Sequence, residues 1–347
     1  MSTLSPARKQ YLEFKKQFPD AILMYQVGDF YETFDEDAYI TARELQSART
    51  TRSYSKGKER VPLAGVPLHA LENYVGKLIQ RGYKVVICEQ IGEVTKGRDV
   101  VERAVTRILT AGTLSEPNLL PSRQNNYLVA IAPGRTQTGL ASVDVSTGEF
   151  SVTWFTPGEL PIALDAELQR LAPVECLLME GSNAQAYQFP SKTITITHCA
   201  PYFFQYEAAQ TRLCKHFGVQ TLEAYGCAQA LQAVAAAGAI LTYLEKMNVA
   251  LLTLLTGLRS YSTSSYMVLD AHTQRNLELL QGTRSGTLQG SLLSVLDRTI
   301  TPMGARQMRR TITQPLLDLG ELNSRLESIE ELYESPAIRT RFAACLQ

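Results

Sequence analysis

The sequence predicts a multidomain α/β protein whose last part is all-helical. Three observations support this fold class: a length of 347 residues, short apolar runs that alternate with amphipathic helical segments, and purely helical periodicity after residue 256. A chain of this length exceeds what one hydrophobic core usually serves. Alternating strands and helices are typical of mixed α/β layers. We expect three units, at residues 1–112, 113–255 and 256–347.

Composition narrows the class of protein. The chain is 45% hydrophobic and 20% charged, as in ordinary globular proteins. No window approaches the roughly eighteen apolar residues of a membrane span, and the N-terminus has no signal-peptide pattern, so we expect a cytoplasmic protein with no membrane partner. The six cysteines include no C-x-x-C pair, and no histidine lies near them in a zinc-like spacing. We therefore expect reduced, mostly buried thiols and no metal site.

Net charge is zero but unevenly distributed. Residues 1–112 carry 17 Lys and Arg against 14 Asp and Glu, residues 113–255 carry 7 against 11, and residues 256–347 carry 10 against 9. The segment from Arg43 to Arg60 holds six basic residues and only two acids. Positive charge near the N-terminus could meet a phosphate backbone. A solvated charged loop would explain the same charge.

The first unit opens with predictable elements. Ser5-Pro6 is a cap followed by a proline, which predicts a helix that Pro19 ends. A buried strand follows at 22–27, and then a helix headed by acids at 35–37, where the helix dipole favours them. Residues 47–61 are polar, basic and rich in Gly and Ser, so we expect a loop or an irregular hairpin there.

The stretch 24–34, MYQVGDFYETF, is the most informative in the chain. A Gly-Asp pair breaks an apolar run, and an aromatic-acid-aromatic cluster follows. In an extended conformation Phe30, Glu32 and Phe34 point to one face and Tyr31 and Thr33 to the other. The simplest explanation is that the two phenylalanines pack in the core and that Glu32 is solvated, because aromatic rings are usually buried.

The rest of the first unit reads as helix and strand. His69–Gln80 has the spacing of an amphipathic helix, Gly82 ends it, and Lys84–Cys88 is a buried strand. We interpret the glycines at 65, 82, 92, 97 and 112 as breaks between secondary-structure elements. The motif G-x-x-x-x-G-K-[ST] occurs nowhere in the sequence, so we expect no phosphate-binding loop.

The second and third units differ in their periodicity. From residue 125 onward we expect strands at 128–131, 139–150 (broken by a Ser-Thr-Gly turn), 176–179 and 193–197, with helices at 160–171 and 224–246. From residue 256 onward, residues 266–279 and 291–310 are helical by period, with a restart at Thr301-Pro302. The chain reaches Gln347 within another expected helix.

Several segments resemble one family in the same order along the chain. GDFYETF resembles the mismatch-reading motif of the MutS family of DNA mismatch repair proteins, in which a Phe-x-Glu element enters the minor groove at a mispair. Residues 61–94 and 101–113 are similar to domain I of that family. DVSTGEF, at 144–150, resembles its RNase-H-like connector domain. Residues 266–279 and 291–310 resemble the entry into its helical core.

The resemblance implies a function and a set of residues. Phe30 would be the wedge inserted at a mispair, and Glu32 would hydrogen-bond the disturbed base. The implied partners are mispaired double-stranded DNA, a second MutS chain, and MutL bound at the connector. ATP and Mg²⁺ would belong to a nucleotide-binding module outside this chain, so we expect no cofactor and no enzyme activity here. Candidates for holding the DNA backbone are Arg52, Lys56, Lys58, Arg60, His69, Lys77 and Arg103.

Other interpretations stay open from the sequence. Asp144 sits where nucleases of the RNase-H-like fold carry a metal-binding carboxylate, which suggests a metal-dependent nuclease, but no second or third convergent acid is evident. A protein-binding scaffold without DNA contact would fit the zero net charge. His69, at an expected helix start, could equally be a helix cap or a packed ring.

Overall fold

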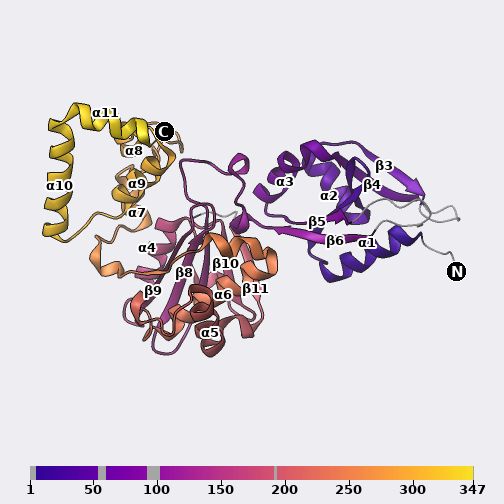
Figure 1. Ribbon diagram of the computed structural model, residues 1–347, viewed down its shortest axis with the longest axis horizontal. Coiled ribbons are helices and arrows are strands. Elements are labelled where there is room, and N and C mark those ends of the chain that lie inside the picture. The colour runs from indigo at the N-terminus through magenta and orange to yellow at the C-terminus, as the bar shows by residue number, and fades with distance from the viewer. Residues whose placement is uncertain (1–4, 54–59, 92–101, 191–193, 347) are drawn as a thin grey trace. The chain divides into compact units, whose positions relative to one another are not determined.

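The computed structural model describes residues 5–53, 60–91, 102–190 and 194–346. These residues divide into two compact units (Figure 1). Unit 1 comprises residues 1–119 and 242–254, and unit 2 comprises residues 120–241 and 255–347. The prediction of a multidomain α/β fold followed by helices is confirmed by the two mixed sheets and the helical C-terminal segment.

Unit 1 is a six-stranded mixed sheet flanked by helices. In the sheet, β1 is parallel to β5, and all other neighbouring strands are antiparallel, in the order β3-β4-β2-β1-β5-β6. The elements are α1 (Pro6–Gln17), β1 (Ala21–Val27), β2 (Phe30–Phe34), α2 (Asp35–Leu45), β3 (Arg49–Ser53), β4 (Arg60–Pro67), η1 (Leu68–Ala70), α3 (Leu71–Gln80), β5 (Lys84–Gln90), β6 (Arg103–Leu109), η2 (Ala111–Thr113), η3 (Pro117–Leu119) and η7 (Val249–Leu254).

A buried carboxylate fixes the N-terminal helix to the sheet. Ser5 caps α1 as predicted, since its side chain accepts from the Arg8 N–H at 3.4 Å. Asp37, which is 3% exposed, accepts hydrogen bonds from the Tyr11 hydroxyl, the Lys15 ammonium and the Leu23 N–H. Burial and the nearby Asp37 raise the pKa of Tyr11. Three elements, α1, β1 and α2, therefore meet at one acid that is fully hydrogen-bonded.

Of the two forms predicted for residues 47–61, a loop or an irregular hairpin, the structure agrees with the hairpin. β3 and β4 form antiparallel pairs from Arg49↔Ala64 to Ser53↔Arg60, with residues 54–59 outside the described part. Gly65 lies within β4 opposite Glu32, so the prediction that it breaks the chain between two elements is wrong. The sequence signal was weak because an edge hairpin needs few apolar residues.

Unit 2 combines a second mixed sheet with helices. Its strand order is β11-β10-β7-β8-β9-β12, with β7, β8 and β9 antiparallel and β10 and β11 parallel to β7, the order of an RNase-H-like sheet. Its elements are β7 (Tyr127–Ala132), β8 (Thr138–Asp144), β9 (Glu149–Phe155), α4 (Ile162–Leu171), β10 (Glu175–Met179), η4 (Ala184–Ala186), β11 (Thr195–Cys199), η5 (Pro201–Phe204), α5 (Tyr206–Phe217), η6 (Glu223–Tyr225), α6 (Leu231–Met247, whose last residues group with unit 1), β12 (Arg259–Ser260), η8 (Thr263–Ser265), α7 (Ala271–Asn276), α8 (Leu292–Leu296), α9 (Pro302–Thr313), α10 (Leu319–Glu334) and α11 (Pro336–Cys345).

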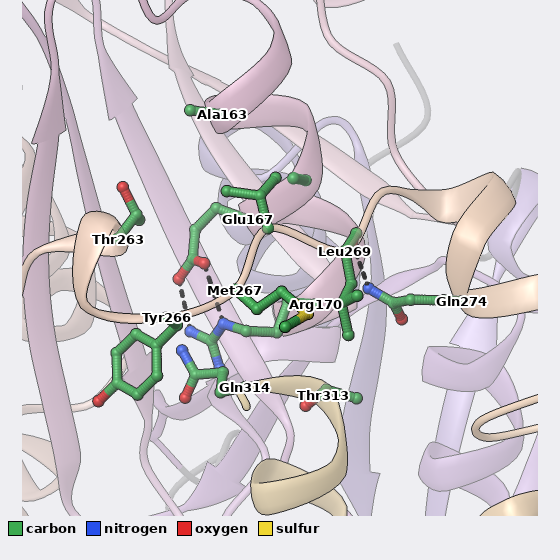
Figure 2. Close-up of a pocket in the computed structure, with 12 residues that line it drawn as sticks. Ala163, Glu167, Arg170, Thr263, Tyr266, Met267, Leu269, Gln274, Thr313 and Gln314 are labelled. Atoms are coloured by element: carbon green, nitrogen blue, oxygen red, sulfur yellow. Dashed lines mark hydrogen bonds and ion pairs between the residues drawn. The ribbon is translucent and has the colours of Figure 1, made fainter. Parts of the chain in front are cut away.

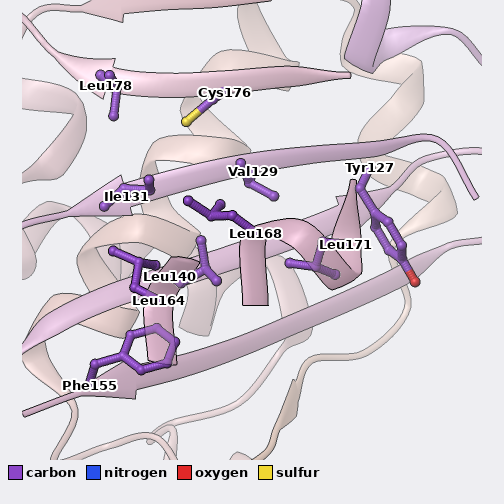
Figure 3. Packing of buried hydrophobic residues seen from close by; sticks show 10 residues of the cluster. All are labelled: Tyr127, Val129, Ile131, Leu140, Phe155, Leu164, Leu168, Leu171, Cys176 and Leu178. Atoms are coloured by element: carbon purple, nitrogen blue, oxygen red, sulfur yellow. The ribbon is translucent and has the colours of Figure 1, made fainter. Parts of the chain in front are cut away.

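Helix α4 packs on one face of the second sheet. Leu164, Leu168 and Leu171 of this helix lie against strand side chains that include Ile131 and Phe155 (Figure 3). All five are nearly inaccessible to solvent. Burial of such side chains is worth about 1.5–3 kcal/mol each, so this layer contributes substantially to the stability of the second sheet.

The opposite face of the sheet is covered at very short range by α6. A Cβ placed on Gly139 of β8 would lie 2.1 Å from the Gln232 carbonyl carbon and 2.3 Å from the Ala233 nitrogen. A Cβ on Gly238 of α6 would lie 2.2 Å from the Cβ of Ala209 in α5. Glycine at these two positions lets helix and sheet, and then helix and helix, approach through their backbones.

The C-terminal segment departs from its predicted form in one place. Residues 266–279 were expected to be helical, but only α7 (Ala271–Asn276) is, and Tyr266 instead forms an isolated bridge to Leu316. Asp270 caps α7 through its bond from the Thr273 N–H, and Glu278 has a positive φ of 48° that ends helical geometry. The restart at Thr301-Pro302 is confirmed as the N-terminus of α9. Among the described residues, no helix combines the length and apolar character needed to cross a bilayer.

Candidate nucleic-acid interface

A two-residue turn presents Phe30 at the end of the first sheet. Val27 pairs with Phe30, so Gly28 and Asp29 alone connect β1 to β2. Gly28 has a φ of +58°, which suits the first position of a tight hairpin turn and which glycine adopts without strain. Phe30 is 49% exposed, whereas the four residues that follow it in β2 are buried. The expectation that Phe30 packs in the core is therefore wrong, and Phe34 is the phenylalanine that does so.

Other apolar side chains are exposed at the same end of the sheet. Leu68 donates its N–H to the Asp29 carbonyl at 2.9 Å, which places it beside the turn, and it is 46% exposed. Ile91, which directly follows β5, is 52% exposed. Single exposed apolar residues are common on soluble proteins, but several around one hairpin tip are typical of a contact surface.

Phe30 and Glu32 lie on the same face of β2, as the strand alternation predicts. Glu32 pairs with Gly65 of β4, and a Cβ on Gly65 would lie 3.8 Å from Phe30 Cδ1 and 3.9 Å from Glu32 Cγ. The bare backbone of Gly65 therefore forms the floor under both side chains. A ring and a carboxylate stand side by side next to an exposed hairpin tip.

Glu32 is not solvated, in contrast to the simplest sequence interpretation. Its side chain is 10% exposed, and Arg52 of β3 donates from Nη1 to its Oε1 at 3.2 Å. Arg52 itself is 54% exposed. The carboxylate is thus held beneath a cation that remains accessible to solvent. Sequence analysis missed this pairing, because the partners are twenty residues apart and lie on strands that are not neighbours.

The opposite face of β2 carries a polar network of its own. The Tyr31 hydroxyl donates to Glu89 at 3.1 Å, and Arg107 lies 3.8 Å from the same carboxylate. Burial, together with the Glu89 charge, raises the pKa of Tyr31 to about 12. Tyr31 therefore stays neutral at physiological pH and anchors the strand that carries Phe30.

The predicted backbone-binding residues divide by exposure. Arg52 and Arg60, which lie at the same end of the β3–β4 pairing, are exposed, as are His69 in η1 and Lys77 in α3. His69 is neither a packed ring nor the cap of α3, whose N-cap position is Ala70. Lys77 lies 5.5 Å over the ring of Tyr74. Lys56 and Lys58 lie outside the described residues.

Arg103 has a different role from the one predicted. It is 8% exposed, its Nε donates to the Gln26 carbonyl at 2.6 Å, and its guanidinium lies 4.6 Å from the centre of the Tyr25 ring. These contacts commit the side chain to holding β6 and β1 together. Nothing in this geometry supports Arg103 as a phosphate contact.

Asp144 is saturated by hydrogen bonds from its own chain. It is fully buried, one oxygen accepts from the Asn125 amide and the Asn126 N–H, and the other accepts from the Ser146 N–H and hydroxyl. This pattern closes the turn between β8 and β9. Across the described ranges, no group of three His, Cys, Asp or Glu side chains is arranged to hold a metal ion. The geometry gives Asp144 a structural role and does not favour the nuclease interpretation.

A cavity in unit 2 lies beside a buried ion pair and is too small for a substrate. It lies against α4, where Arg170 donates two hydrogen bonds to Glu167 at 2.9 and 2.5 Å (Figure 2). Its volume is about 40 Å³, which leaves room for only a few water molecules. Burial raises the pKa of Glu167, but Arg170 and the Tyr261 hydroxyl outweigh it and hold that pKa below the ordinary value. We read this cluster as a buried structural ion pair.

The fold and the site together define a multidomain α/β protein with an aromatic–acid pair at a hairpin tip. The chain matches the family descriptions MutS domain I at residues 5–118, MutS domain II at residues 126–256 and MutS domain III at residues 272–347. The chain belongs to the MutS family of DNA mismatch repair proteins. The family resemblance inferred from the sequence is thereby confirmed.

Curated relatives align with almost the whole chain. It is 44% identical to the DNA mismatch repair protein MutS of Dehalococcoides mccartyi over 100% of this chain and 40% of the relative. The MutS of Symbiobacterium thermophilum is 44% identical over 99% of this chain and 40% of its own length. The MutS of Methanosarcina acetivorans is 39% identical over 97% and 39%, respectively. The chain thus spans about 40% of the length of the relatives it matches.

Proposed function

We propose that this chain recognises mispaired or looped duplex DNA through unit 1, with Phe30 as an aromatic wedge that enters the minor groove. The observation that carries the proposal is the half-exposed ring of Phe30, which stands directly after a tight turn and beside Glu32. The names of the relatives, DNA mismatch repair protein MutS, support the same assignment.

An aromatic wedge suits a detector that must ignore sequence. Any base pairs can surround an error, so hydrogen bonding to particular base edges cannot identify it. A ring can stack on every base, and such stacking is worth about 1–3 kcal/mol per base. Insertion requires unstacking and kinking of the duplex, which costs a few kcal/mol and costs least where the pairing is already disturbed. The mispair is therefore the site where Phe30 inserts most favourably.

Glu32 would also help to distinguish mispaired duplex from intact duplex. A carboxylate near phosphates is repelled by about 1 kcal/mol per unit charge at 4 Å in water, and by more where water is excluded. Hydrogen bonding to a base N–H, or protonation and donation to a base, would compensate for this cost. A disturbed pair offers such a partner, whereas an intact pair has its groups in use. Glu32 would thus penalise sound duplex.

Positively charged side chains would hold the backbone around the wedge. Arg60 is the first residue of β4, and Phe30 pairs with Pro67, the last residue of that strand. Phe30 and Arg60 therefore lie about 23 Å apart, at roughly 3.3 Å per residue. That distance exceeds the minor-groove width of about 6 Å, which suits a phosphate contact outside the groove. His69 and Lys77 are exposed candidates from the following helices. Such contacts position the protein without reading sequence.

The family membership supports further proposals about the wider assembly. We propose the division into a mismatch-recognition domain at 1–112, a connector at 113–255 and the start of a helical core at 256–347, which the three family matches support. A second MutS chain and MutL, the latter at the connector, are the proposed protein partners. These 347 residues would not hydrolyse ATP and would need no cofactor, and the protein would act in the cytoplasm.

Equilibrium binding tests the proposal directly. The purified chain is titrated with a labelled duplex that contains one mispair or one unpaired base, and with the same duplex fully paired. We expect tighter binding to the disturbed duplex, and a loss of that preference in Phe30→Ala. Tyr39→Ala is a matched control, because Tyr39 is 48% exposed in the same unit but lies on α2. Equal affinity for the two duplexes would contradict the proposal.

A further inference from the structure

A polar hollow in unit 2 is lined by arginines from three separate elements. They are Arg259 of β12, Arg310 of α9 and Arg325 of α10. The volume of the hollow is about 110 Å³, enough for a small ion or for one group of a larger molecule. Like charges repel one another, so three guanidinium groups around one hollow are a costly arrangement that a bound anion would relieve.

The charges at this arginine hollow do not cancel. Arg310 pairs with Glu149 at 3.2 Å. Arg325 pairs with Glu321, which also lines the hollow, at 3.1 Å. Within the described part of the chain, no hydrogen bond or ion pair engages the side chain of Arg259, which is exposed. Three cations and two carboxylates therefore leave one positive charge without a counter-ion.

The two paired arginines also keep hydrogen-bond donors for a ligand. A guanidinium has five N–H groups. Arg310 uses its Nε and one N–H of Nη1, which leaves both N–H groups of Nη2. Arg325 uses Nη2 alone in its bond to the neighbouring turn of α10. With the five groups of Arg259, the free donors exceed the roughly four lone pairs that a carboxylate ligand offers.

Backbone pairing holds the walls of the hollow in place. Arg259 pairs with Ser151 of β9, so β12 belongs to the second sheet. Tyr266, another lining residue, forms an antiparallel bridge to Leu316, which lies between α9 and α10. The fold itself therefore brings the arginines together before any ligand arrives. A site that is formed in advance binds with a smaller cost of ordering.

We propose that the arginine hollow is a binding site for a phosphate group, with Arg259 as its principal contact. Guanidinium and phosphate oxygens form paired, charge-assisted hydrogen bonds. A phosphate has three strong acceptor oxygens that point in different directions, which suits donors arriving from three elements. The site goes beyond mispair recognition, because it uses none of the residues assigned to the mispair. Two sources share this chemistry, a small phosphate compound and the backbone of DNA.

Calorimetric titration of the chain with inorganic phosphate, at an ionic strength held constant with chloride, tests the site. We expect saturable binding, which Arg259→Gln should weaken about tenfold. The melting temperature in phosphate-free buffer should stay unchanged in this variant, because Arg259 has no side-chain partner to lose. Arg259→Lys should bind with intermediate affinity, since lysine keeps the charge but not the planar fork. Arg135→Gln is the matched control, an exposed arginine between β7 and β8 of the same unit.

Competition identifies the source of the phosphate. Displacement of inorganic phosphate by adenosine monophosphate, with duplex binding unchanged in Arg259→Gln, would assign the site to small phosphate compounds. Displacement by fully paired duplex would assign it to the DNA backbone. In that case the slope of log K against log salt concentration should be shallower by about 0.9 in Arg259→Gln. Either result supports the phosphate site.

Three results would overturn the phosphate site. They are the absence of saturable phosphate binding, equal binding by Arg259→Gln and the wild-type chain, and stronger displacement by a glutamate-rich peptide than by either phosphate source. The last would assign the hollow to an acidic protein segment. Phe30→Ala should bind phosphate as the wild-type chain does, so failure of mispair recognition and failure of the phosphate site can be told apart.

Discussion

Phe30 and Glu32 share one floor, the backbone of Gly65, at distances that leave room for a Cβ and for little more. The Cβ of an alanine at position 65 would meet Phe30 Cδ1 at 3.8 Å and Glu32 Cγ at 3.9 Å, which is ordinary van der Waals contact. Because position 65 has no side chain, the ring and the carboxylate can lie directly over the backbone of β4. The exposed fraction of Phe30 depends on the turn, and its orientation depends on this floor.

Substitution of Gly65 tests that floor. Gly65→Ala should retain the preference for mispaired duplex, because its added atom fits. Gly65→Val should reduce the preference about tenfold, because its branched carbons extend into the space of both side chains. Thermal stability should change by less than about 1 kcal/mol in either variant, since valine suits a strand. Binding titrations with paired and mispaired duplex provide the measurement, and full preference in Gly65→Val would show that the floor is unimportant.

Removal of the acid should affect intact duplex most. Glu32→Ala is expected to raise affinity for perfect duplex about fivefold, which corresponds to the roughly 1 kcal/mol of repulsion between unit charges at 4 Å. The ratio of affinities for mispaired and perfect duplex should shrink accordingly. Glu72→Ala removes one exposed acid from α3 of the same unit and controls for net charge. Unchanged binding of perfect duplex by Glu32→Ala would refute the repulsion argument.

Asp144 distinguishes a structural carboxylate from a metal ligand. Asp144→Ala should destabilise the protein by about 2–4 kcal/mol, because buried donors such as the Asn126 N–H lose their acceptor. Chemical denaturation monitored by circular dichroism measures this loss. Incubation of the wild-type chain with duplex DNA and magnesium should give no cleavage. Cleavage that disappears in Asp144→Asn would instead support the nuclease interpretation.

The close approach of α6 to β8 gives a test of the fold in unit 2. Gly139→Ala should cost more than about 3 kcal/mol, because its Cβ would overlap the backbone of Gln232 and Ala233, which cannot move aside as a side chain can. Gly158→Ala is the matched control, since a Cβ there meets nothing within 4 Å. Melting temperatures of the two variants should differ clearly, and equal values would show that the helix does not lie against this strand.

Local sequence patterns were sufficient for the helices α1, α2 and α3 and for the strands β1 and β5 of unit 1. The cap at Ser5, the acids at the head of α2 and the spacing of α3 are short-range signals, and each appears where predicted. The alternation in β2 likewise placed Phe30 and Glu32 on one face. Such signals predict local structure well because they depend only on residues that are close in the sequence.

Tertiary contacts account for what the sequence did not reveal. The ion pair of Arg52 with Glu32 requires the order of three strands, β3, β4 and β2, which no local pattern contains. The exposure of Phe30 depends on where its strand ends relative to its neighbours. Helix α5 was not predicted at all, although its end at Gly218, with a φ of +67°, is a recognisable stop signal. Residues 266–279 have helical periodicity, but only Ala271–Asn276 form a helix, and the remaining residues form a bridge and turns.

The most direct test of the wedge uses a fluorescent base beside the mispair. 2-Aminopurine is quenched when stacked, so its fluorescence reports whether the neighbouring step is opened when the chain binds. We expect a clear rise on binding of the wild-type chain and of Tyr39→Ala, and little or no rise with Phe30→Ala at concentrations that saturate the duplex. An equal rise with Phe30→Ala would mean that another group opens the step, and would contradict the assignment of Phe30.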